Sequence, residues 1–592
     1  MKNRLTSLTS GQMSELINVA IGKEKADLAI VGGTLLDVYS GELLEGWGVA
    51  VKGKRIAYVG KDVNTTIGTE TRVINAAGKI LIPGLIDSHN HLFWYFRTDE
   101  GIKWALKGGT TTIVTEMLEV VFSLGYQGAV KFLDSIENQP MKVLATVPPM
   151  VSTSQRNVSE AIGVAELRKL LKHDLVVGLG ESYWSSVVKG DKRVLDLLAE
   201  TSYQGKKIMG HSAGATGNKL VAYLVNDVRS CHEPITVPEV LERLRLGAYV
   251  ILREGGIRRD LEQLSGLKDL KIDTRRLTFC SDGLMPKDLV ETGHMNYVVQ
   301  KAINLGFDPV VAIQMATLNA AEHLSMDNII GGIAPGRYAD ILIIPDIKTI
   351  RAEYVISYGQ IAAKDGELLV QPRKQVFPGW ASKRVLLSPD FTPAMFAIRT
   401  DKSKTTATVR VIDQITEIVT RAGQATVPVS KGAIGIDVDK DLLKVAVIDF
   451  RVQPLKMFVG LIRGFKMKKG AFASSQAWDL TAVIVAGASE KDMAKAVNRV
   501  IAMQGGIVLS IDGEIAAEVP LTIGAFVSEL PMEELAARLD DIQTKLEKLG
   551  MPFGNAHLSL TTLTSPAIPF IRICEDGLVD VKEDKLVDLV IN

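Results

Sequence analysis

Cysteine is scarce in this sequence, which has only Cys231, Cys280 and Cys574 among its 592 residues. Three cysteines cannot form a disulfide framework, and this indicates a reducing compartment. An excess of either charge is also missing, because 68 Lys and Arg residues balance 68 Asp and Glu residues. Phosphate binding needs surplus cations, so the balance argues against nucleic acid or an anionic membrane as the main partner.

Long apolar runs are missing as well. No stretch reaches the roughly 20 apolar residues that a membrane helix needs, and residues 1–28 lack the apolar core of a signal peptide. Hydrophobic residues make up 46% and charged residues 23%, a globular mixture that excludes wholesale disorder. At ~150 residues per domain we expect about four units, or fewer if one is a barrel. We therefore expect a cytoplasmic multidomain protein that has no membrane span and binds no nucleic acid.

Two β-rich segments lie on either side of a long middle region. Residues 27–60 and 339–370 both carry short β-branched runs separated by Gly, which is typical of strands and hairpins. We predict one small β domain assembled from residues 1–79, which include an N-terminal helix, and residues 336–372.

The middle region, residues 80–335, has a different spacing of apolar runs. Eight short apolar runs recur, each followed by a helix-length stretch: ILIPGLIDSH, TTTIVTEM, MKVLATVPPM, DLVVGLGE, KKIMGHSA, NDVRSCHE, AYVILREG and LTFCSDG. Apolar strands that alternate with helices indicate a parallel sheet in an α/β fold, and eight units are what a TIM-type (β/α)8 barrel requires. An open doubly wound sheet is the alternative, but the count of eight and the lack of a Gly-rich fingerprint after the first strand favour the barrel.

The remaining chain follows the second β-rich segment. Residues 373–399 contain prolines and few apolar runs, so we predict a linker there. Residues 400–592 alternate strand-like and helical pieces, which predicts a C-terminal α+β domain.

Histidines and carboxylates occur where the predicted barrel strands end. The six residues are His89, His91, Glu181, His211, His232 and Asp282. Active sites of such barrels lie at the carboxyl ends of the strands, so these side chains should converge on one rim. Imidazole with carboxylate is a ligand set for Zn, Mn or Fe rather than Ca or Mg. Taken one at a time, the His-x-His pair could be a coincidence and each carboxylate could cap a helix. Because the candidates end separate strands in barrel order, the six residues together favour a metal site.

The other histidines have weaker claims. His294 lies just beyond the eighth strand and could reach the site. His173 and His557 lie in polar or loop-like segments, and His323 lies in a helical pattern, so we expect these three to be surface or structural residues.

At these positions the sequence resembles the amidohydrolase superfamily and, within it, the adenine deaminase family. The resemblance covers nearly the whole chain and is carried by IPGLIDSHNHL (82–92), GLGE (178–181), GHSAGATG (210–217), CHEP (231–234), RLGAYVILREG (245–255), FCSDG (279–283), DLVETGH (288–294), IAPGRYADI (333–341), ASSQAWD (473–479) and DGLVDV (576–581).

The resemblance implies a centre of two divalent metal ions, Mn, Zn or Fe. Glu181 would bridge the two ions; His89, His91 and Asp282 would hold one, and His211 and His232 the other. It also implies that a metal-bridging hydroxide attacks a ring carbon while Asp282 transfers the proton. The implied activity is hydrolysis of a C–N bond in a small purine-type substrate, with adenine deamination as the nearest named reaction. We also expect a homo-oligomer, a dimer.

Two segments depart from the family pattern. Family members carry Pro-His-Glu where this chain has Met117, Leu118 and Glu119, and a histidine-rich run where this chain has Gln476–Leu480. Polar positions expected beside the substrate have thus become Leu118 and either Trp478 or Leu480. A site built to hydrogen-bond one base discriminates through such groups, so we expect adenine to be a poorer substrate than an oxidised purine or a related cyclic amide.

Six residues are the candidates for binding the substrate: Glu119, Arg253, Glu254, His294, Trp478 and Asp479. The alternative function is ring opening of a cyclic amide, either a xanthine-like oxidised purine or a hydantoin-type ring. That reaction uses the same attack but releases an in-ring nitrogen rather than an exocyclic one. A scaffold protein that has lost catalysis is a further alternative, and the presence of all six metal-ligand candidates argues against it.

Overall fold

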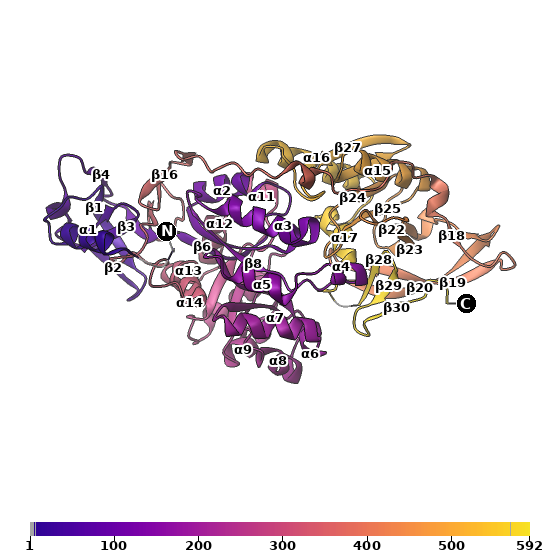
Figure 1. The fold of residues 1–592 in the computed structure, drawn as a ribbon, viewed down its shortest axis with the longest axis horizontal. Coiled ribbons are helices and arrows are strands. Elements are labelled where there is room, and N and C mark those ends of the chain that lie inside the picture. The colour runs from indigo at the N-terminus through magenta and orange to yellow at the C-terminus, as the bar shows by residue number, and fades with distance from the viewer. Residues whose placement is uncertain (1–4, 6–7, 569, 592) are drawn as a thin grey trace.

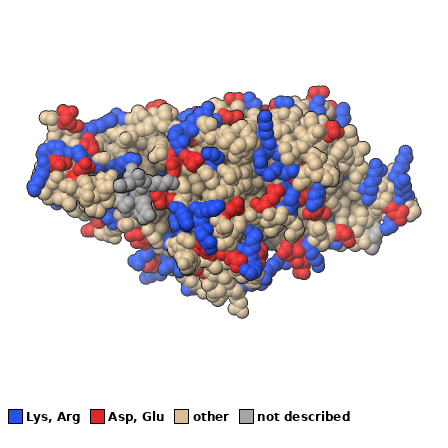
Figure 2. Space-filling view, in the orientation of Figure 1, with Lys and Arg blue, Asp and Glu red and all other residues tan. Residues whose placement is uncertain are grey.

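A computed structural model describes residues 5, 8–568 and 570–591 of the chain. Figure 1 shows three parts in succession along the long axis: a β domain, a barrel and a C-terminal domain. No helix within the described residues is long and apolar enough to cross a membrane. Cationic and anionic side chains are interspersed over the face drawn in Figure 2.

The central part is a barrel of parallel strands. In the described part of the chain, eight strands pair in chain order: β6 (Leu85–Asn90), β7 (Thr110–Glu116), β8 (Lys142–Val147), β9 (Val176–Tyr183), β10 (Lys207–His211), β11 (Ser230–Cys231), β12 (Tyr249–Arg253) and β13 (Leu277–Cys280). The ring closes just beyond β13, where Asp282 N donates to His89 O at 3.1 Å and His91 N donates to Asp282 O at 2.9 Å. The predicted (β/α)8 barrel is confirmed, and an open doubly wound sheet is excluded.

Helices cover the outside of the barrel. Those that follow the successive strands are α2 (Thr98–Lys107), α3 (Leu118–Ile136), α5 (Val164–Leu171), α7 (Lys192–Tyr203), α8 (Gly217–Leu224), α9 (Val237–Arg245), α10 (Leu261–Leu264) and α12 (Met295–Asn304). Their apolar faces bury every residue of β7 and β8, as expected for strands that are covered on both sides. The start of α9 is fixed by a capping box, in which Thr236 and Glu239 satisfy each other's backbone N–H groups.

The β domain combines both flanking segments in one sheet. Its strands are β1 (Leu28–Asp37), β2 (Glu42–Lys52), β3 (Arg55–Gly60), β4 (Arg72–Asn75), β5 (Ile80–Pro83), β14 (Ile341–Ile344), β15 (Tyr354–Ser357), β16 (Gln360–Lys364) and β17 (Glu367–Leu368). Antiparallel pairing of β5 with β14 joins the early and late segments, and α1 (Ser10–Ala20) packs on the early strands. A buried ion pair between Lys142 and Asp340, 2.7 Å apart, joins this domain to the base of the barrel.

The C-terminal part is an α+β domain, as predicted. Its main sheet contains β18 (Ile398–Arg399), β19 (Thr406–Gln414), β20 (Thr420–Ser430), β21 (Ala433–Ile434), β22 (Leu443–Asp449), β23 (Met457–Arg463), β24 (Ala471–Ser474), β25 (Ala482–Gly487), β26 (Gly506–Ile511) and β27 (Glu514–Pro520). A smaller sheet contains β28 (Ile571–Cys574), β29 (Gly577–Asp580) and β30 (Lys585–Val587), and the main helices are α15 (Glu490–Ala502), α16 (Met532–Lys548) and α17 (Ala556–Thr561). Within the stretch predicted as a linker, Gln375, Ala381 and Phe396 are buried, so this segment packs against its neighbours.

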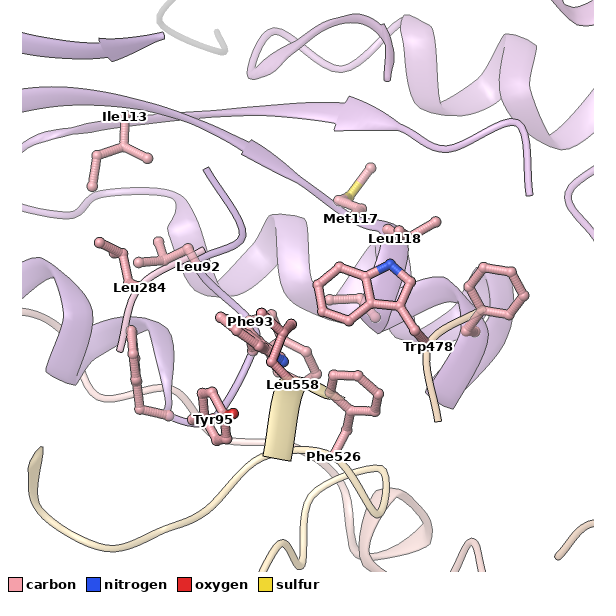
Figure 3. Packing of buried hydrophobic residues seen from close by; sticks show 14 of the residues in the cluster. Leu92, Phe93, Tyr95, Ile113, Met117, Leu118, Leu284, Trp478, Phe526 and Leu558 are labelled. Atoms are coloured by element: carbon pink, nitrogen blue, oxygen red, sulfur yellow. The ribbon is translucent and has the colours of Figure 1, made fainter. Parts of the chain in front are cut away.

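The C-terminal domain packs against the mouth of the barrel. Leu92, Phe93 and Tyr95 of the barrel share one apolar cluster with Trp478 and Leu558 of the C-terminal domain (Figure 3).

One buried histidine ties the two parts together. The Nδ1 atom of His557 lies 2.6 Å from the hydroxyl of Tyr95, and its Nε2 atom lies 2.9 Å from the hydroxyl of Ser474. Burial lowers the pKa of His557 to about 3, so the ring stays neutral. This link holds the loop after His91 against the segment that leads to Trp478.

Candidate metal centre

Four of the predicted ligands surround one point at the barrel mouth. Nε2 of His89 lies 3.4 Å from Glu181 Oε1 and 3.3 Å from Asp282 Oδ1. Nε2 of His91 lies 3.5 Å and 3.3 Å from the same two oxygens. Ligand atoms bound tetrahedrally at 2.0–2.1 Å are about 3.4 Å apart, so the spacing fits a single divalent cation.

The hydrogen-bonding state of these atoms supports the same interpretation. His89 Nε2, His91 Nε2 and Asp282 Oδ1 are buried, and none has a hydrogen-bond partner among the described residues. Buried polar atoms are normally satisfied, and atoms that face one another without a bond are what a metal-free ligand set leaves. The buried His, Glu and Asp side chains therefore indicate a site for a divalent metal.

A second group lies beside the first. His211, His232 and Glu233 bring their ligand atoms together, with Glu233 Oε1 3.4 Å from His211 Nε2 and 3.2 Å from His232 Nε2. Glu181 Oε1 is also 3.3 Å from His232 Nε2, so this carboxylate lies between the two groups. The sequence pattern did not identify Glu233, although it directly follows His232.

Local backbone geometry places Asp282 in the centre. The residue follows β13 and has a φ of 57°, a left-handed conformation that Asp tolerates better than most residues. Beneath it, Asp87 accepts hydrogen bonds from Asn90 at 3.1 Å and from the Ser281 hydroxyl. His294 Nε2 lies 2.9 Å from the same carboxylate, so this histidine supports the floor of the site and does not enter it.

Two further carboxylates face the other ring nitrogens of the His-x-His pair. Glu119 Oε1 lies 2.5 Å from His91 Nδ1, and Glu116 Oε1 lies 3.7 Å from His89 Nδ1. Such outer carboxylates orient metal-binding imidazoles. Sequence reasoning missed Glu116, although it also ends a barrel strand. A Cβ on Gly180 would lie 1.9 Å from Glu116 Oε2, so glycine is needed there to leave room for the carboxylate.

Arg253 contacts a carboxylate of each of the two ligand groups, Asp282 and Glu233. Its Nη1 lies 3.0 Å from Asp282 Oδ2 and 2.5 Å from Glu233 Oε1, and its Nε lies 3.0 Å from Asp260 Oδ2. Burial alone would raise the pKa of Asp282, but the neighbouring His89 and His91 and the charge of Arg253 hold this pKa well below its usual range. Asp282 is therefore ionised at neutral pH.

The imidazoles show the opposite shift. Burial would lower the pKa of His91, yet Glu119 and Asp282 raise it well above its ordinary value. Glu181 and Glu233 similarly outweigh burial and raise the pKa of His232. Both rings therefore hold a proton more tightly than an exposed imidazole does.

A small cavity of about 50 Å³ opens onto this centre. The barrel residues that line it include Tyr183, His232, Arg253 and Asp282, and the C-terminal domain contributes Trp478, Leu558, Thr562 and Ser565. The indole ring of Trp478 lies 5.7 Å from the His91 ring. The C-terminal domain therefore forms one wall of the cavity.

The six residues predicted to bind substrate are found in different places. Arg253 and Trp478 line the cavity, Glu119 lies behind His91, and His294 lies beneath the centre, as described above. Glu254 pairs with Lys301 at 2.8 Å and is not a lining residue.

Asp479 lies one layer behind the cavity wall. Its carboxyl group accepts hydrogen bonds from Ser565 at 2.6 Å and Tyr183 at 3.3 Å, and both of these residues line the cavity. Burial raises the pKa of Asp479 to about 8 in spite of these bonds, with the charge of Glu181 adding to the effect. Tyr183 could have been found from the sequence, because it lies two residues after Glu181 on the same face of β9.

Comparison with known proteins adds independent findings. Residues 80–368 match the model of the amidohydrolase family, and residues 417–585 match that of the adenine deaminase C-terminal domain. The adenine deaminase of Moorella thermoacetica is 36% identical over 583 residues, which cover 97% of this chain and 98% of the relative. That of Cenarchaeum symbiosum is 34% identical over 584 residues, which cover 98% and 95%.

Solved structures that resemble this chain match only part of it. A molinate hydrolase aligns with a TM-score of 0.45 at 18% identity, covering 57% of this chain and 95% of that one. A dihydropyrimidinase from Brevibacillus agri aligns with a TM-score of 0.45 at 16% identity, covering 59% and 99%.

Proposed function

Because this chain belongs to the adenine deaminase family of amidohydrolases, we propose that it is a metal-dependent hydrolase that cleaves a C–N bond of a purine-type base. Conversion of adenine and water to hypoxanthine and ammonia is the nearest named reaction. The observation that carries the proposal is the convergence of three imidazoles, those of His89, His91 and His232, on Oε1 of Glu181 at the barrel mouth.

Two divalent ions, Mn, Zn or Fe, would be held in this centre. His89, His91 and Asp282 would hold one ion, His211 and His232 the other, and Glu181 would contact both. Cations of this kind lower the pKa of water and supply a nucleophile at neutral pH.

Asp282 is the proposed proton carrier. The carboxylate is ionised at neutral pH, so it has a lone pair free for a proton from the attacking water, and Arg253 holds Oδ2 at 3.0 Å. The same carboxyl group would then deliver the proton to the leaving nitrogen.

Residues of the cavity wall would bind the base. The flat indole of Trp478 offers a face for stacking a heterocycle. Arg253 Nη2 is buried and has no acceptor among the described residues, so it is available to donate to a ring nitrogen or a carbonyl oxygen of the substrate. Tyr183 and Ser565, which are supported by Asp479, complete the polar side of the cavity.

Ring opening of a cyclic amide is the second candidate function. It is favoured by one observation: Leu118 and Trp478 lie in the same apolar cluster (Figure 3), where the family resemblance leads us to expect imidazoles. With fewer polar partners on that side, the cavity has less means of recognising the ring nitrogens of adenine.

A substrate screen tests both candidates. The full-length protein is loaded with Mn, Zn or Fe and offered adenine, oxidised purines and hydantoin-type rings, while ammonia and ring absorbance are followed together. Ammonia release with an intact ring supports deamination, and loss of ring absorbance without ammonia supports ring opening. A His91→Asn variant purified in parallel controls for contaminating host deaminases. No turnover of any base by the metal-loaded protein would contradict the proposal.

The cytoplasmic location and the homodimer are part of the same proposal. The low cysteine content supports the cytoplasmic location. Light scattering of the purified protein tests the dimer.

A further inference from the structure

Glu233 has a place in the centre that neither the sequence pattern nor the proposed reaction uses. It lies two residues after the end of the short strand β11, and the chain bends at His232, so that the side chains of His232 and Glu233 both point into the site. Two backbone contacts to Cys231 Sγ, from Ser212 N and Glu233 N at 3.4 Å each, stabilise the turn.

The spacing around Glu233 matches that of the first group. Its Oε1 is 3.4 Å from His211 Nε2 and 3.2 Å from His232 Nε2. Asp282 Oδ1 is 3.3 Å from each of its two imidazoles. Both sets of distances agree with the separation of about 3.4 Å expected for neighbouring ligands of one cation.

The charges of the two groups are also balanced. The first group has two imidazoles and Asp282, and it shares Glu181 with the second. Without Glu233, the second group would have two neutral imidazoles and only the shared carboxylate to offset a divalent ion. With Glu233 each ion has one carboxylate of its own, and Arg253 Nη1 contacts both of these carboxylates.

A purely structural role for Glu233 explains less. Arg253 already pairs with Asp260 and Asp282, so its charge is compensated without a third carboxylate. A carboxylate oxygen has a second lone pair, so Oε1 can accept from Arg253 and still face the imidazoles.

We propose that Glu233 is a ligand of the second metal ion, together with His211, His232 and the shared Glu181, and that Arg253 positions it. This inference rests on the proposed metal-dependent function.

Titration of the metal-free, full-length protein with Mn²⁺ tests the proposal without turnover. Calorimetry and the electron paramagnetic resonance signal report the two binding events separately. We expect Glu233→Gln to bind the first equivalent as the wild type does and the second at least about 100-fold more weakly, because loss of even an outer-sphere partner costs 10–100-fold. Glu262→Gln is the matched control, since Glu262 is an exposed carboxylate on α10 with no ion pair among the described residues. It should bind both equivalents normally.

Two equivalents bound by Glu233→Gln with wild-type affinity would overturn the proposal. If that variant does not fold, anomalous diffraction from Mn²⁺-soaked wild-type crystals decides: a second Mn²⁺ bound to Glu233 supports the proposal, and a second Mn²⁺ without Glu233 in its coordination sphere refutes it. Two ions with Glu233 bound but no turnover of any base would refute only the proposed function. Full turnover with Glu233 unbound would refute only this inference.

Discussion

Asp282→Asn tests whether this carboxylate serves two sides of the centre. Oδ1 faces Nε2 of His89 and of His91 at 3.3 Å each, and Oδ2 accepts from Arg253 Nη1 at 3.0 Å. An asparagine amide has one acceptor oxygen and one NH₂ group, so it can serve only one of these sides. An NH₂ group toward Arg253 sets donor against donor, and an NH₂ group toward the histidines removes a metal ligand.

The expected loss follows from these contacts. Removing one proton-transfer group costs ~10²–10⁴-fold in rate. Losing a hydrogen bond to a charged group costs about 1.5–3 kcal/mol, or one to two further decades if it acts in the transition state. We therefore expect most of the metal to remain bound and kcat/KM to fall by several orders of magnitude. The assay measures kcat/KM and metal content on the same preparation, with the best substrate from the screen.

Asp260→Asn is the matched control for Asp282→Asn. It makes the same chemical change next to the same arginine, since Asp260 Oδ2 is 3.0 Å from Arg253 Nε, but Asp260 is in neither ligand group. We expect a much smaller loss of turnover with normal metal content. Near wild-type turnover in metal-loaded Asp282→Asn would remove this residue from the mechanism. Equal losses in both variants would assign the effect to Arg253 instead of proton transfer.

Three further predictions concern metal binding, substrate choice and acid stability. The raised pKa values of His91 and His232 mean that metal must displace protons from these rings, so metal affinity should fall as the pH falls and Mn²⁺ binding should release protons. Calorimetry in buffers of different ionisation enthalpy measures the number of protons released, and a release of zero would contradict the prediction. Adenine should have a lower kcat/KM than an oxidised purine or cyclic amide by about one to two decades, because an unpaired buried polar group costs ~1–3 kcal/mol. The Trp478→His variant should narrow this difference in kcat/KM. A wide advantage for adenine would show that the departures from the family pattern at Leu118 and Trp478 are neutral. Burial lowers the pKa of His323 to about 3, so the stability contributed by the neutral ring is full above the unfolded pKa of about 6.5 and is lost as the pH falls toward 3. The expected loss in the free energy of unfolding is roughly 2 kcal/mol between pH 7 and pH 5. In denaturant unfolding, the His323→Leu variant should lose correspondingly less free energy of unfolding over this range than the wild type, and an equal loss would exclude His323 as the source.

The ends of the barrel strands made the convergence of the proposed metal ligands predictable. Parallel barrel strands all deliver their last residues to one rim, so the order of the chain was enough to bring His89, Glu181 and Asp282 together. Glu254 shows the limit of this logic. It directly follows the cavity-lining Arg253, yet its side chain turns to Lys301.

Other parts of the site depend on contacts that no local pattern contains. The direction of Glu233 follows from a turn after a two-residue strand, where strand alternation no longer applies. The contact between Tyr183 and Asp479 joins residues 296 positions apart in the chain. Closure of the cavity by the C-terminal domain therefore could not be derived from spacing, because it depends on an apolar cluster that residues far apart in the chain build together.

The wall that the C-terminal domain contributes has a consequence for how such an enzyme can diversify. The proposed metal ligands all lie between His89 and Asp282, whereas Trp478, Leu558 and Ser565 come from a separate domain. Mutation or recombination within the C-terminal domain can therefore change which molecule fits while the reactive machinery remains intact. A lineage could in this way move from one heterocycle to another without passing through an inactive, metal-free ancestor.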